Sequence, residues 1–576
     1  MPIDHSTEFI VIGVYLLIII SVGFVFDRFN RNTDDYFRGG CRTSWWMVGM
    51  SSFMQGFSAW TFTAAAGVAF AAGWSVTVFY LANAVGFVVA FFLAPWFRQL
   101  RIAATTEVDR LRYSEAFAQF SSVLSALSGP IYSALQIYGL SMFAATVFGY
   151  DVNTVIIVLG AVAVVYSALG GVWGVMATDF LQGMILLPVT VFIAVACLHE
   201  VGGISGLFAE IEAQGLKETF QVVKPDGAFP QGAYTWFWVI AIFITNGKNF
   251  VMLGNASRYA AVKDGREARK AAITGAVLFL FGAFIWCIPP MVARLLYEAQ
   301  VMASPAPKPA ESAYVIAALN VLPAGLIGIL SVAVFSATLS SLDTGLNRQS
   351  AIVVRVIYPG ICRLFNLTPM SDRGQLHLSR TLTLMLGAGA VALAVHFANL
   401  QGTGLFELML KLMAFMVGMA VPGLLGLFVR NVPSWAPFVA IAAGAVTALL
   451  GLYSKELFGE SWSFQVRALV NLFVASAAFL ATIPFYRYAP ESYRRQVDAF
   501  FSRMKTPVDF ETEVGNSSDH TQLKIMGAYT ALIGFLVVCL AALPDSGLMA
   551  TLIGGTMLLC GGFMWWLGRR LTTPAT

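Results

Sequence analysis

An all-α polytopic membrane protein with about 15 spans is the fold class that this sequence predicts. Of its 576 residues, 58% are hydrophobic and only 11% are charged, and the mean hydropathy is +0.74. Soluble proteins carry about 25% charged residues. Apolar runs long enough to cross a bilayer recur from Phe9 almost to the C-terminus. Basic residues also gather in alternate loops, which is typical of helical membrane proteins.

The apolar runs predict the individual spans, with edges good to a few residues. They are 9–26, 45–73, 75–97, 116–149, 153–169, 173–199, 234–254, 270–298, 325–357, 377–399, 404–430, 435–455, 466–486, 523–545 and 548–570. With the N-terminus outside, the basic loops such as 98–112, 258–270 and 487–505 all face inward. We therefore expect an integral plasma (bacterial inner) membrane protein with a cytoplasmic C-terminus.

The spans fall into two sets of five, and an odd number inverts the second set relative to the first. We expect residues 1–44 to form an extra N-terminal helix and a cytoplasmic loop, and 45–199 to form the first five-helix repeat. An extracytoplasmic loop, 200–233, then leads to the inverted second repeat, 234–430. Additional C-terminal helices occupy 431–576, with a cytoplasmic linker at 487–522 that its charges predict to be solvated. The outer loops 200–233 and 299–324 are expected to form partial lids.

The opening helix of each repeat carries polar residues that predict an interruption. Ser51, Ser52, Gln55, Gly56 and Ser58 interrupt the first, and Thr245, Asn246, Gly247, Lys248, Asn249 and Gly254 interrupt the second. Paired interruptions in equivalent helices indicate a transporter site near the bilayer midplane.

The segment from Phe335 to Thr344 places five hydroxyl side chains and one carboxylate in a predicted span. Burying so many polar groups is unfavourable unless something binds them. Ala337, Ser340, Ser341 and Thr344 share one helical face, and neutral oxygens beside one carboxylate suit a hard monovalent cation. Unpaired carbonyls of the interruption at 54–59 would complement them, so we expect a sodium site. The alternative is that these small residues only let helices pack closely.

Other intramembrane charges allow more than one interpretation. Asp179 could cap a helix N-terminus or snorkel to the interface. Lys248 needs a carboxylate, a carbonyl or an anionic solute as its partner. Glu407 and Lys411 are spaced to neutralise one another on one helix.

A pattern between Tyr166 and Gln182 resembles the Gly-Gly and Thr-Asp-x-x-Gln signature of the sodium/solute symporter family. That family includes sodium-coupled transporters of glucose, galactose, proline and sialic acid. The stretch 336–341 resembles its sodium-site helix, and 258–270 resembles the cytoplasmic loop after its second broken helix. The resemblance covers about residues 45–430. It implies a LeuT-type fold, with two inverted five-helix repeats preceded by one extra helix.

The resemblance also implies specific cation ligands. The main sodium site would use the carbonyls of Met54, Phe57 and Ala337 and the hydroxyls of Ser340 and Ser341. Some members hold a second cation, for which the matching positions are Asp179, Asp343 and Thr344. Asp343 replaces the usual Ser, so it could strengthen that site, bind a proton instead or pair with Arg348.

The solute is expected between the two broken helices. The candidate polar residues are Gln55, Ser58, Thr61, Asn83, Asn246, Lys248 and Asn249. Trp60, Phe79, Tyr80 and Trp238 could stack on a sugar ring, although sugar-transporting members carry Glu at the position of Tyr80.

We therefore predict a symporter whose partners are sodium, a small-molecule solute and the lipid bilayer. A sugar or sugar acid is the first expectation, and an amino acid or carboxylate is the alternative. A sodium-leak channel or a transport-derived sensor is the competing class. No nucleophile–base spacing and no nucleic-acid module is apparent, so neither an enzyme nor a nucleic-acid partner is expected.

Overall fold

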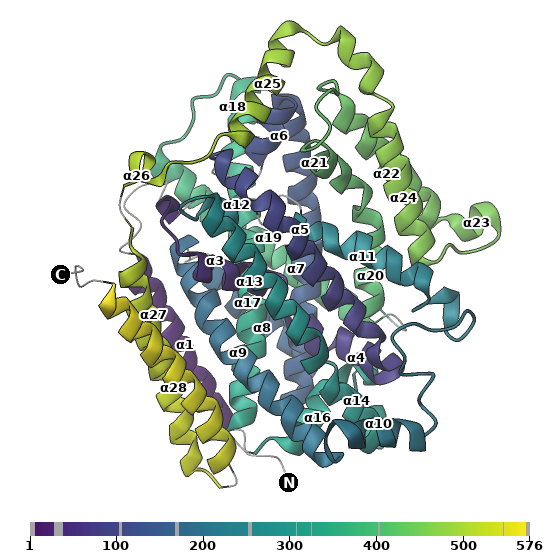
Figure 1. Cartoon of the computed structure of the whole chain (residues 1–576). Coiled ribbons are helices and arrows are strands. Elements are labelled where there is room, and N and C mark those ends of the chain that lie inside the picture. The colour runs from purple at the N-terminus through teal and green to yellow at the C-terminus, as the bar shows by residue number, and fades with distance from the viewer. Residues whose placement is uncertain are drawn as a thin grey trace.

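The protein is helical throughout the part that its computed structural model describes (Figure 1). That part comprises residues 6–27, 39–102, 106–167, 172–251, 256–306, 308–323, 325–400, 404–515, 517–544 and 546–571. Within it, 10 helices are long and apolar enough to cross a membrane, or up to 11 if one bent pair counts as a single span. The polytopic helical membrane class is therefore confirmed. The larger count of about 15 also includes shorter apolar helices, and it stays a prediction.

The first half of the chain begins with a single helix, α1 (Ser6–Asp27), and continues with a broken one. The broken helix consists of α3 (Trp45–Gln55), η2 (Ala59–Phe62) and α4 (Ala64–Ala72). It is followed by α5 (Thr77–Gln99), α6 (Thr106–Arg112), α7 (Glu115–Phe148), α8 (Val152–Ser167) and α9 (Val172–Glu200). The predicted interruption of the first opening helix is thus present, at Gly56–Ser58.

The second half starts with α11 (Trp236–Val251), α12 (Ala256–Ala260) and α13 (Gly265–Ile285). It continues with α17 (Leu326–Ile352), α19 (Asp372–Ala398), α20 (Leu405–Met416) and α21 (Val421–Leu425). The interruption expected at 245–249 is wrong in position, because α11 stays helical through Val251. Gly254 lies outside the described residues.

Two groups of helices surround the centre of the molecule. One consists of α3, α5, α11 and α13, and the other of α7, α8, α9, α17 and α19. Helix α17 is the most enclosed span, with 94% of its apolar window buried, against 22% for α1 and for α19. The helix that carries the predicted sodium ligands Ser340 and Ser341 is therefore surrounded by protein rather than by lipid.

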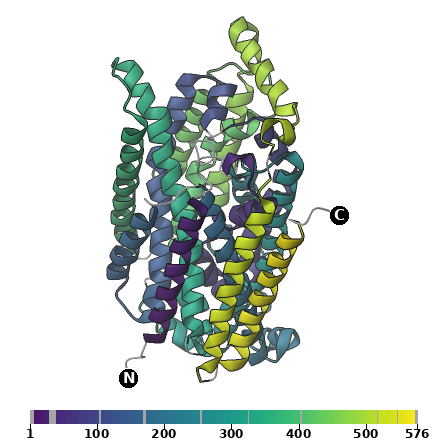
Figure 2. The ribbon, with the colours of Figure 1, turned by 90° about the vertical axis from the view of Figure 1, so that its left-hand side faces the viewer.

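The C-terminal part adds helices at the periphery. These are α22 (Ala436–Leu452), α24 (Phe464–Leu480), α25 (Glu491–Lys505), α27 (Asp519–Cys539) and α28 (Gly547–Arg570). Helices α27 and α28 form a hairpin that lies along α1 and α9 (Figures 1 and 2).

The segment 487–522 is not the solvated linker that its charges predict. Helix α25 packs against α5 and α6, and Val497 and Phe500 on its inner face are buried. The Arg112 guanidinium of α6 donates a hydrogen bond of 3.2 Å to the Tyr493 hydroxyl. The apolar residues of α25 recur at helical spacing and form one face, with the charged residues on the other. The apolar face accounts for this docking, since it needs a partner.

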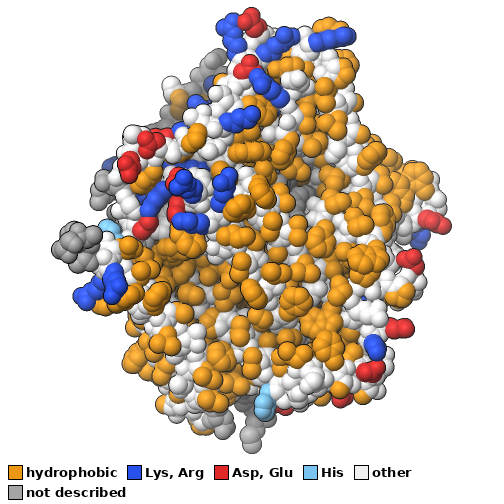
Figure 3. Space-filling model, in the orientation of Figure 1, with side chains coloured by type: hydrophobic (Ala, Val, Ile, Leu, Met, Phe, Trp, Pro, Cys, Tyr) orange, Lys and Arg blue, Asp and Glu red, His pale blue; other side chains and the backbone are white. Residues whose placement is uncertain are grey.

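The two ends of the molecule differ in charge. Hydrophobic side chains cover most of the face in Figure 3, and Lys and Arg gather mainly in its upper half, near α25 and α12. We call this the basic end. The opposite end carries α10 (Gly203–Ala213), α14 (Ile288–Leu296), η5 (Pro309–Ser312) and α16 (Ala313–Val321).

Candidate functional site

The centre of the site is the break between α3 and η2. Gly56 and Phe57 donate only turn-type hydrogen bonds, to Phe53 O at 3.0 Å and Met54 O at 3.1 Å. Ser58 is fully extended, with φ −161° and ψ −179°. Carbonyls at such a break lack their usual helical donors and can accept other partners.

Ser341 of α17 faces this break directly. Its hydroxyl oxygen lies 2.9 Å from Phe57 O and 3.2 Å from both Met54 O and Gln55 O. A hydroxyl has one proton and can satisfy only one of these carbonyls at a time. Besides this hydroxyl proton, the four oxygens receive the Phe57 N–H, which Met54 O accepts at 3.1 Å. The cluster is therefore still electron-rich, which is the environment that a hard cation stabilises.

Ser340 supplies a further oxygen without a competing bond. Its hydroxyl is buried and has no hydrogen-bond partner within the described part of the chain, although it faces Asp179. Burying a hydroxyl without a partner costs about 1–3 kcal/mol. Ala337, one turn earlier, is fully buried at 0% exposure. The structure thus brings Met54, Phe57 and Ser341 to one place, and Ser340 lies next to Ser341 on α17, facing Asp179.

Thr338 plays a part that the sequence did not predict. Its hydroxyl accepts a hydrogen bond of 2.9 Å from Ala59 N, and it donates one of 3.0 Å to Val334 O of its own helix. The side chain thereby holds the start of η2 against α17. In the sequence, only the position of Thr338 next to the predicted sodium ligands pointed to this role.

Asp179 lies two turns inside α9 with 0% exposure, so it does not cap that helix. Its Oδ2 accepts hydrogen bonds from Ser51 Oγ at 2.5 Å and from Arg258 at 3.2 Å. The same guanidinium donates to Ser51 Oγ at 2.8 Å, to Thr344 Oγ1 at 3.2 Å and to Gln55 Oε1. A buried arginine of α12 therefore binds two of the three residues expected to hold a second cation.

Arg258 begins the stretch that was expected to form a cytoplasmic loop, but it lies on the short helix α12 and its side chain is buried. Its side chain is 4% exposed and spans from α12 to α3, α9 and α17. The third expected ligand, Asp343, is 2% exposed and accepts a hydrogen bond from Asn347 Nδ2 at 2.5 Å. It lies within electrostatic range of both Asp179 and Arg258. Two buried carboxylates thus face one guanidinium.

The candidate solute residues divide into three groups. Gln55 is engaged by Arg258, and Ser58 caps η2 by accepting from Trp60 N at 3.4 Å. Thr61 and Asn83 are buried, and the side-chain amide oxygen of Asn83, Oδ1, has no hydrogen-bond partner within the described residues.

On α11, Asn246 donates to Phe79 O at 3.1 Å. The side chains of Lys248 and Asn249 lie outside what the structure describes.

The predicted aromatic side chains pack on one another. The Trp60 ring centroid lies 5.3 Å from that of Phe79 and 6.3 Å from that of Phe406, and Phe79 lies 5.5 Å from Trp238. The Trp60 indole N–H is buried without a partner among the described residues. Aromatic faces with an unpaired N–H and an unpaired amide oxygen fit a polar, ring-shaped solute.

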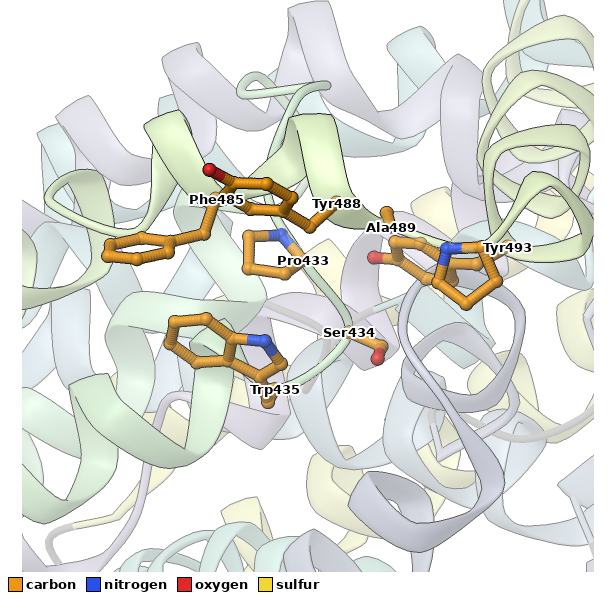
Figure 4. Close-up of a pocket in the computed structure, with 8 residues that line it drawn as sticks. Pro433, Ser434, Trp435, Phe485, Tyr488, Ala489 and Tyr493 are labelled. Carbon is orange, nitrogen blue, oxygen red and sulfur yellow. The ribbon is translucent and has the colours of Figure 1, made fainter.

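A pocket of about 150 Å³ lies at the basic end, between the segment just before α22, the short helix η8 (Ile483–Tyr488) and the start of α25 (Figure 4). Its lining includes Trp435, Phe485, Tyr488 and Tyr493. None of these residues belongs to the broken helix or to α17, so this pocket is separate from the oxygen cluster around Ser341.

A sequence model of the sodium:solute symporter family matches residues 36–444 of the chain. Among curated proteins, the chain is 27% identical to the sodium/sialic acid symporter NanT of Aliivibrio fischeri, over 77% of this chain and 87% of that one. It is 25% identical to the sodium/sialic acid symporter SiaT of Proteus mirabilis, over 77% and 89% of the two chains. It is 26% identical to a sodium/glucose cotransporter of Vibrio parahaemolyticus, over 78% and 86%.

Among solved structures, the fold is similar to that of a Na⁺-coupled sialic acid symporter in a substrate-bound, outward-open state. The TM-score is 0.71 at 22% identity, with 84% of this chain and 98% of that chain covered. Mhp1, a nucleobase-cation-symport transporter, aligns with a TM-score of 0.54 at 14% identity, over 81% of this chain and 99% of that one.

Proposed function

The chain belongs to the sodium:solute symporter family, and we propose that it imports a sugar or sugar acid together with sodium by alternating access. Sodium would bind between the break in α3–η2 and the Ser340–Ser341 face of α17. The basic end would face the cytoplasm, which places the N-terminus outside and the C-terminus inside. The two helix groups would be the moving parts of two inverted five-helix repeats.

The observation that carries the proposal is the oxygen cluster around Ser341. Three backbone carbonyls lie within 3.2 Å of its hydroxyl, and the neighbouring Ser340 hydroxyl is buried without a partner in the described chain. Neutral oxygens can replace the hydration of sodium without binding it too tightly. The carbonyl of Ala337 would complete the ligand set.

The position of this cluster suggests how sodium and solute are coupled. It joins the broken helix, which carries Trp60 and Thr61, to α17 of the other helix group. A cation bound there would fix η2 and with it the candidate solute residues. Sodium would therefore raise the affinity for solute, and by linkage the solute would raise the affinity for sodium to the same extent.

The second expected cation position has a different content in this chain. Arg258 supplies a positive charge to Asp179 and Thr344, so we propose that one sodium ion is coupled and that the guanidinium replaces a second. Asp343 would remain a second carboxylate within electrostatic range of this arginine, beside Asp179.

The solute class is inferred from the aromatic cluster and from relatives. Trp60 Nε1 and Asn83 Oδ1 are buried and unpaired within the described residues, which suits a hydroxyl-rich solute. The relatives named above transport sialic acid or glucose. A carboxylated sugar would need a cation, for which Lys248 is the candidate.

A sodium-dependent thermal-shift screen on purified protein tests the proposal. Glucose, galactose, N-acetylneuraminic acid, proline and short carboxylates would be added in NaCl or in choline chloride. We expect a sugar or sialic acid to raise the unfolding midpoint only with sodium present. Stabilisation by an amino acid alone would change the solute class, and equal stabilisation in choline would contradict sodium coupling.

A further inference from the structure

The end of the molecule opposite to the basic end contains a buried carboxylate that the sodium site does not use. Glu311 of η5 is 4% exposed. Its Oε1 accepts a hydrogen bond of 3.4 Å from Phe406 N, at the start of α20. Its Oε2 is buried and has no hydrogen-bond partner within the described residues.

Glu311 acts as a helix cap that comes from another segment. The N-cap residue of α20 is Gly404, which offers no side chain to the free N–H groups of the first turn. A carboxylate at a helix N-terminus supplies the missing acceptor and interacts favourably with the helix dipole. The bond therefore fixes the beginning of α20 to η5.

The start of α20 packs against the broken helix and against α7. The Phe406 ring stacks on Trp60 with centroids 6.3 Å apart, and a Cβ on Gly139 of α7 would come within 2.9 Å of Leu405. Glu311 also packs on α4, because a Cβ on Gly67 would meet its Cγ at 3.0 Å. One side chain thus joins η5, α4 and α20 in the closed arrangement.

We propose that Glu311 is a proton-binding latch of the outer gate, protonated when α20 is closed against η5 and ionised when the gate opens to water. The inference rests on the proposed function, in which this end faces outside. A protonated carboxyl keeps Oε1 as an acceptor for Phe406 N and turns Oε2 into a donor. The Tyr138 hydroxyl of α7 is buried within electrostatic range of this carboxyl, but neither it nor Oε2 has a hydrogen-bond partner among the described residues, so the two are not bonded to each other in the closed arrangement.

The direction of the pH effect follows from burial. In the closed arrangement, burial raises the pKa of Glu311 from 4.5 to about 7, against the opposing effects of the Phe406 N–H and of Lys308. Glu407 of α20 adds to the rise, and it pairs with Lys308 at 2.5 Å rather than with Lys411 as expected. Lys308, Glu407 and Tyr138 are the titratable groups that face Glu311 from the described elements packed against it.

The closed gate binds the proton more tightly than the open gate, so acid favours closure. A solvated Glu has a pKa of about 4.5. The ratio of closed to open molecules should therefore change between pH 4.5 and about 7 and stay nearly constant at higher pH. From about pH 8 to about pH 5.5 the ratio of closed to open molecules should rise up to about thirtyfold.

Spin-label distance measurements test this on the full chain without any solute. Labels at Ala299 of α15 (Glu298–Met302) and at Lys411 of α20, in a variant that lacks the exposed Cys539 and Cys560, report how far α20 lies from the η5 region. We expect a shorter distance at about pH 5.5 and a longer one at about pH 8, in NaCl and in choline chloride.

Glu311→Gln should hold the short distance at both pH values, because the amide mimics the protonated acid. The matched control, Glu407→Gln, removes the half-buried carboxylate of the same gate and should keep the pH response. If Glu311→Gln does not fold, Glu311→Met takes its place. Methionine cannot titrate, so this variant should also lose the response of the distance to pH.

An identical distance at both pH values in the unmodified gate would overturn the proposal, as would a persistent response in Glu311→Gln or Glu311→Met. Sodium coupling is tested separately by the thermal-shift screen, so equal stabilisation by a solute in NaCl and in choline chloride would contradict that coupling and leave the latch intact. The two proposals therefore fail in distinguishable ways.

Discussion

At the scale of single residues, Ser340 and Ser341 are adjacent in sequence but differ in what they contribute. Ser341 is bonded to the break even without a cation, since its hydroxyl lies 2.9 Å from Phe57 O. Ser340 is buried and unpaired within the described residues. The first hydroxyl therefore stabilises the fold as well as the ion, whereas the second, which faces Asp179, has no bond to the break to lose.

Alanine at each position should separate these two contributions. Ser341→Ala should lower the free energy of unfolding without sodium by about 1 kcal/mol, because a buried hydrogen bond is lost. Ser340→Ala should leave it unchanged or raise it, since an unsatisfied polar atom is removed. Both changes should weaken sodium binding at least about tenfold, or ~1.4 kcal/mol. Thermal unfolding across a sodium titration at constant ionic strength measures both quantities.

Ser331→Ala on the same helix is the control. The Ser331 hydroxyl is buried but bonds Ile327 O of its own helix at 2.9 Å, so its loss should not affect sodium. Unchanged sodium stabilisation in both Ser340→Ala and Ser341→Ala would remove the sodium site from this face of α17.

The sequence predicts this site well because its residues are close in the chain and share one helical face. It predicts the neighbouring charges poorly. Arg258 lies in a run of basic residues that looks cytoplasmic, and only the packing of α12 turns its side chain inward. The Lys308–Glu407 pair likewise joins residues 99 positions apart. Local spacing cannot reveal partners that the fold brings together.

At the scale of elements, the α27–α28 hairpin shows how glycine position sets helix packing. A Cβ on Gly554 would lie 2.5 Å from Gly534 O and 2.7 Å from Val538 N, so the two backbones are in direct contact there. Gly555, the next residue, has nothing within 4 Å of a Cβ. Small residues at such crossings allow the close approach that stabilises helix pairs in membranes.

Gly554→Ala should therefore separate the hairpin, and Gly555→Ala should not. A Cβ facing backbone atoms cannot be relieved by rotating a side chain, so we expect a loss of about 1–3 kcal/mol from overpacking. Gly555→Ala should be neutral or slightly stabilising, because alanine favours helix over glycine by about 1 kcal/mol. Hydrogen exchange of peptides from α27 measures the difference. Equal protection in the two variants would contradict the close crossing.

The elements themselves were predicted to different degrees. The break of the first opening helix was predicted correctly from its polar residues, whereas α11 runs helically through residues that looked equally disruptive. Ser, Thr and Asn can bond the backbone of their own helix in place of breaking it, as Thr245 does with Ala241 O at 2.7 Å. Composition alone does not decide between these outcomes.

At the scale of the whole molecule, Arg258 connects the two helix groups that alternating access must move. It reaches Ser51 and Gln55 in one group and Asp179 and Thr344 in the other. Breaking such a buried pair by removing one partner costs about 3–5 kcal/mol. The pair therefore joins the two groups near the basic end, while Glu311 joins η5 to the start of α20 at the opposite end.

A tethered arginine in place of a second cation predicts a single coupled sodium. Binding of radiolabelled sodium to purified protein should saturate at about one ion per chain, with a Hill slope of about one. Arg258→Gln should free Asp179 and Thr344 beside Asp343, so the slope should rise above one as the buried carboxylates recruit a second ion. Arg348→Gln, on α17 at an exposed position one turn from Asp343, is the control and should keep the slope. Saturation at two ions in the unmodified chain would mean that Arg258 leaves Asp179 when sodium binds, and the one-ion proposal would then be wrong.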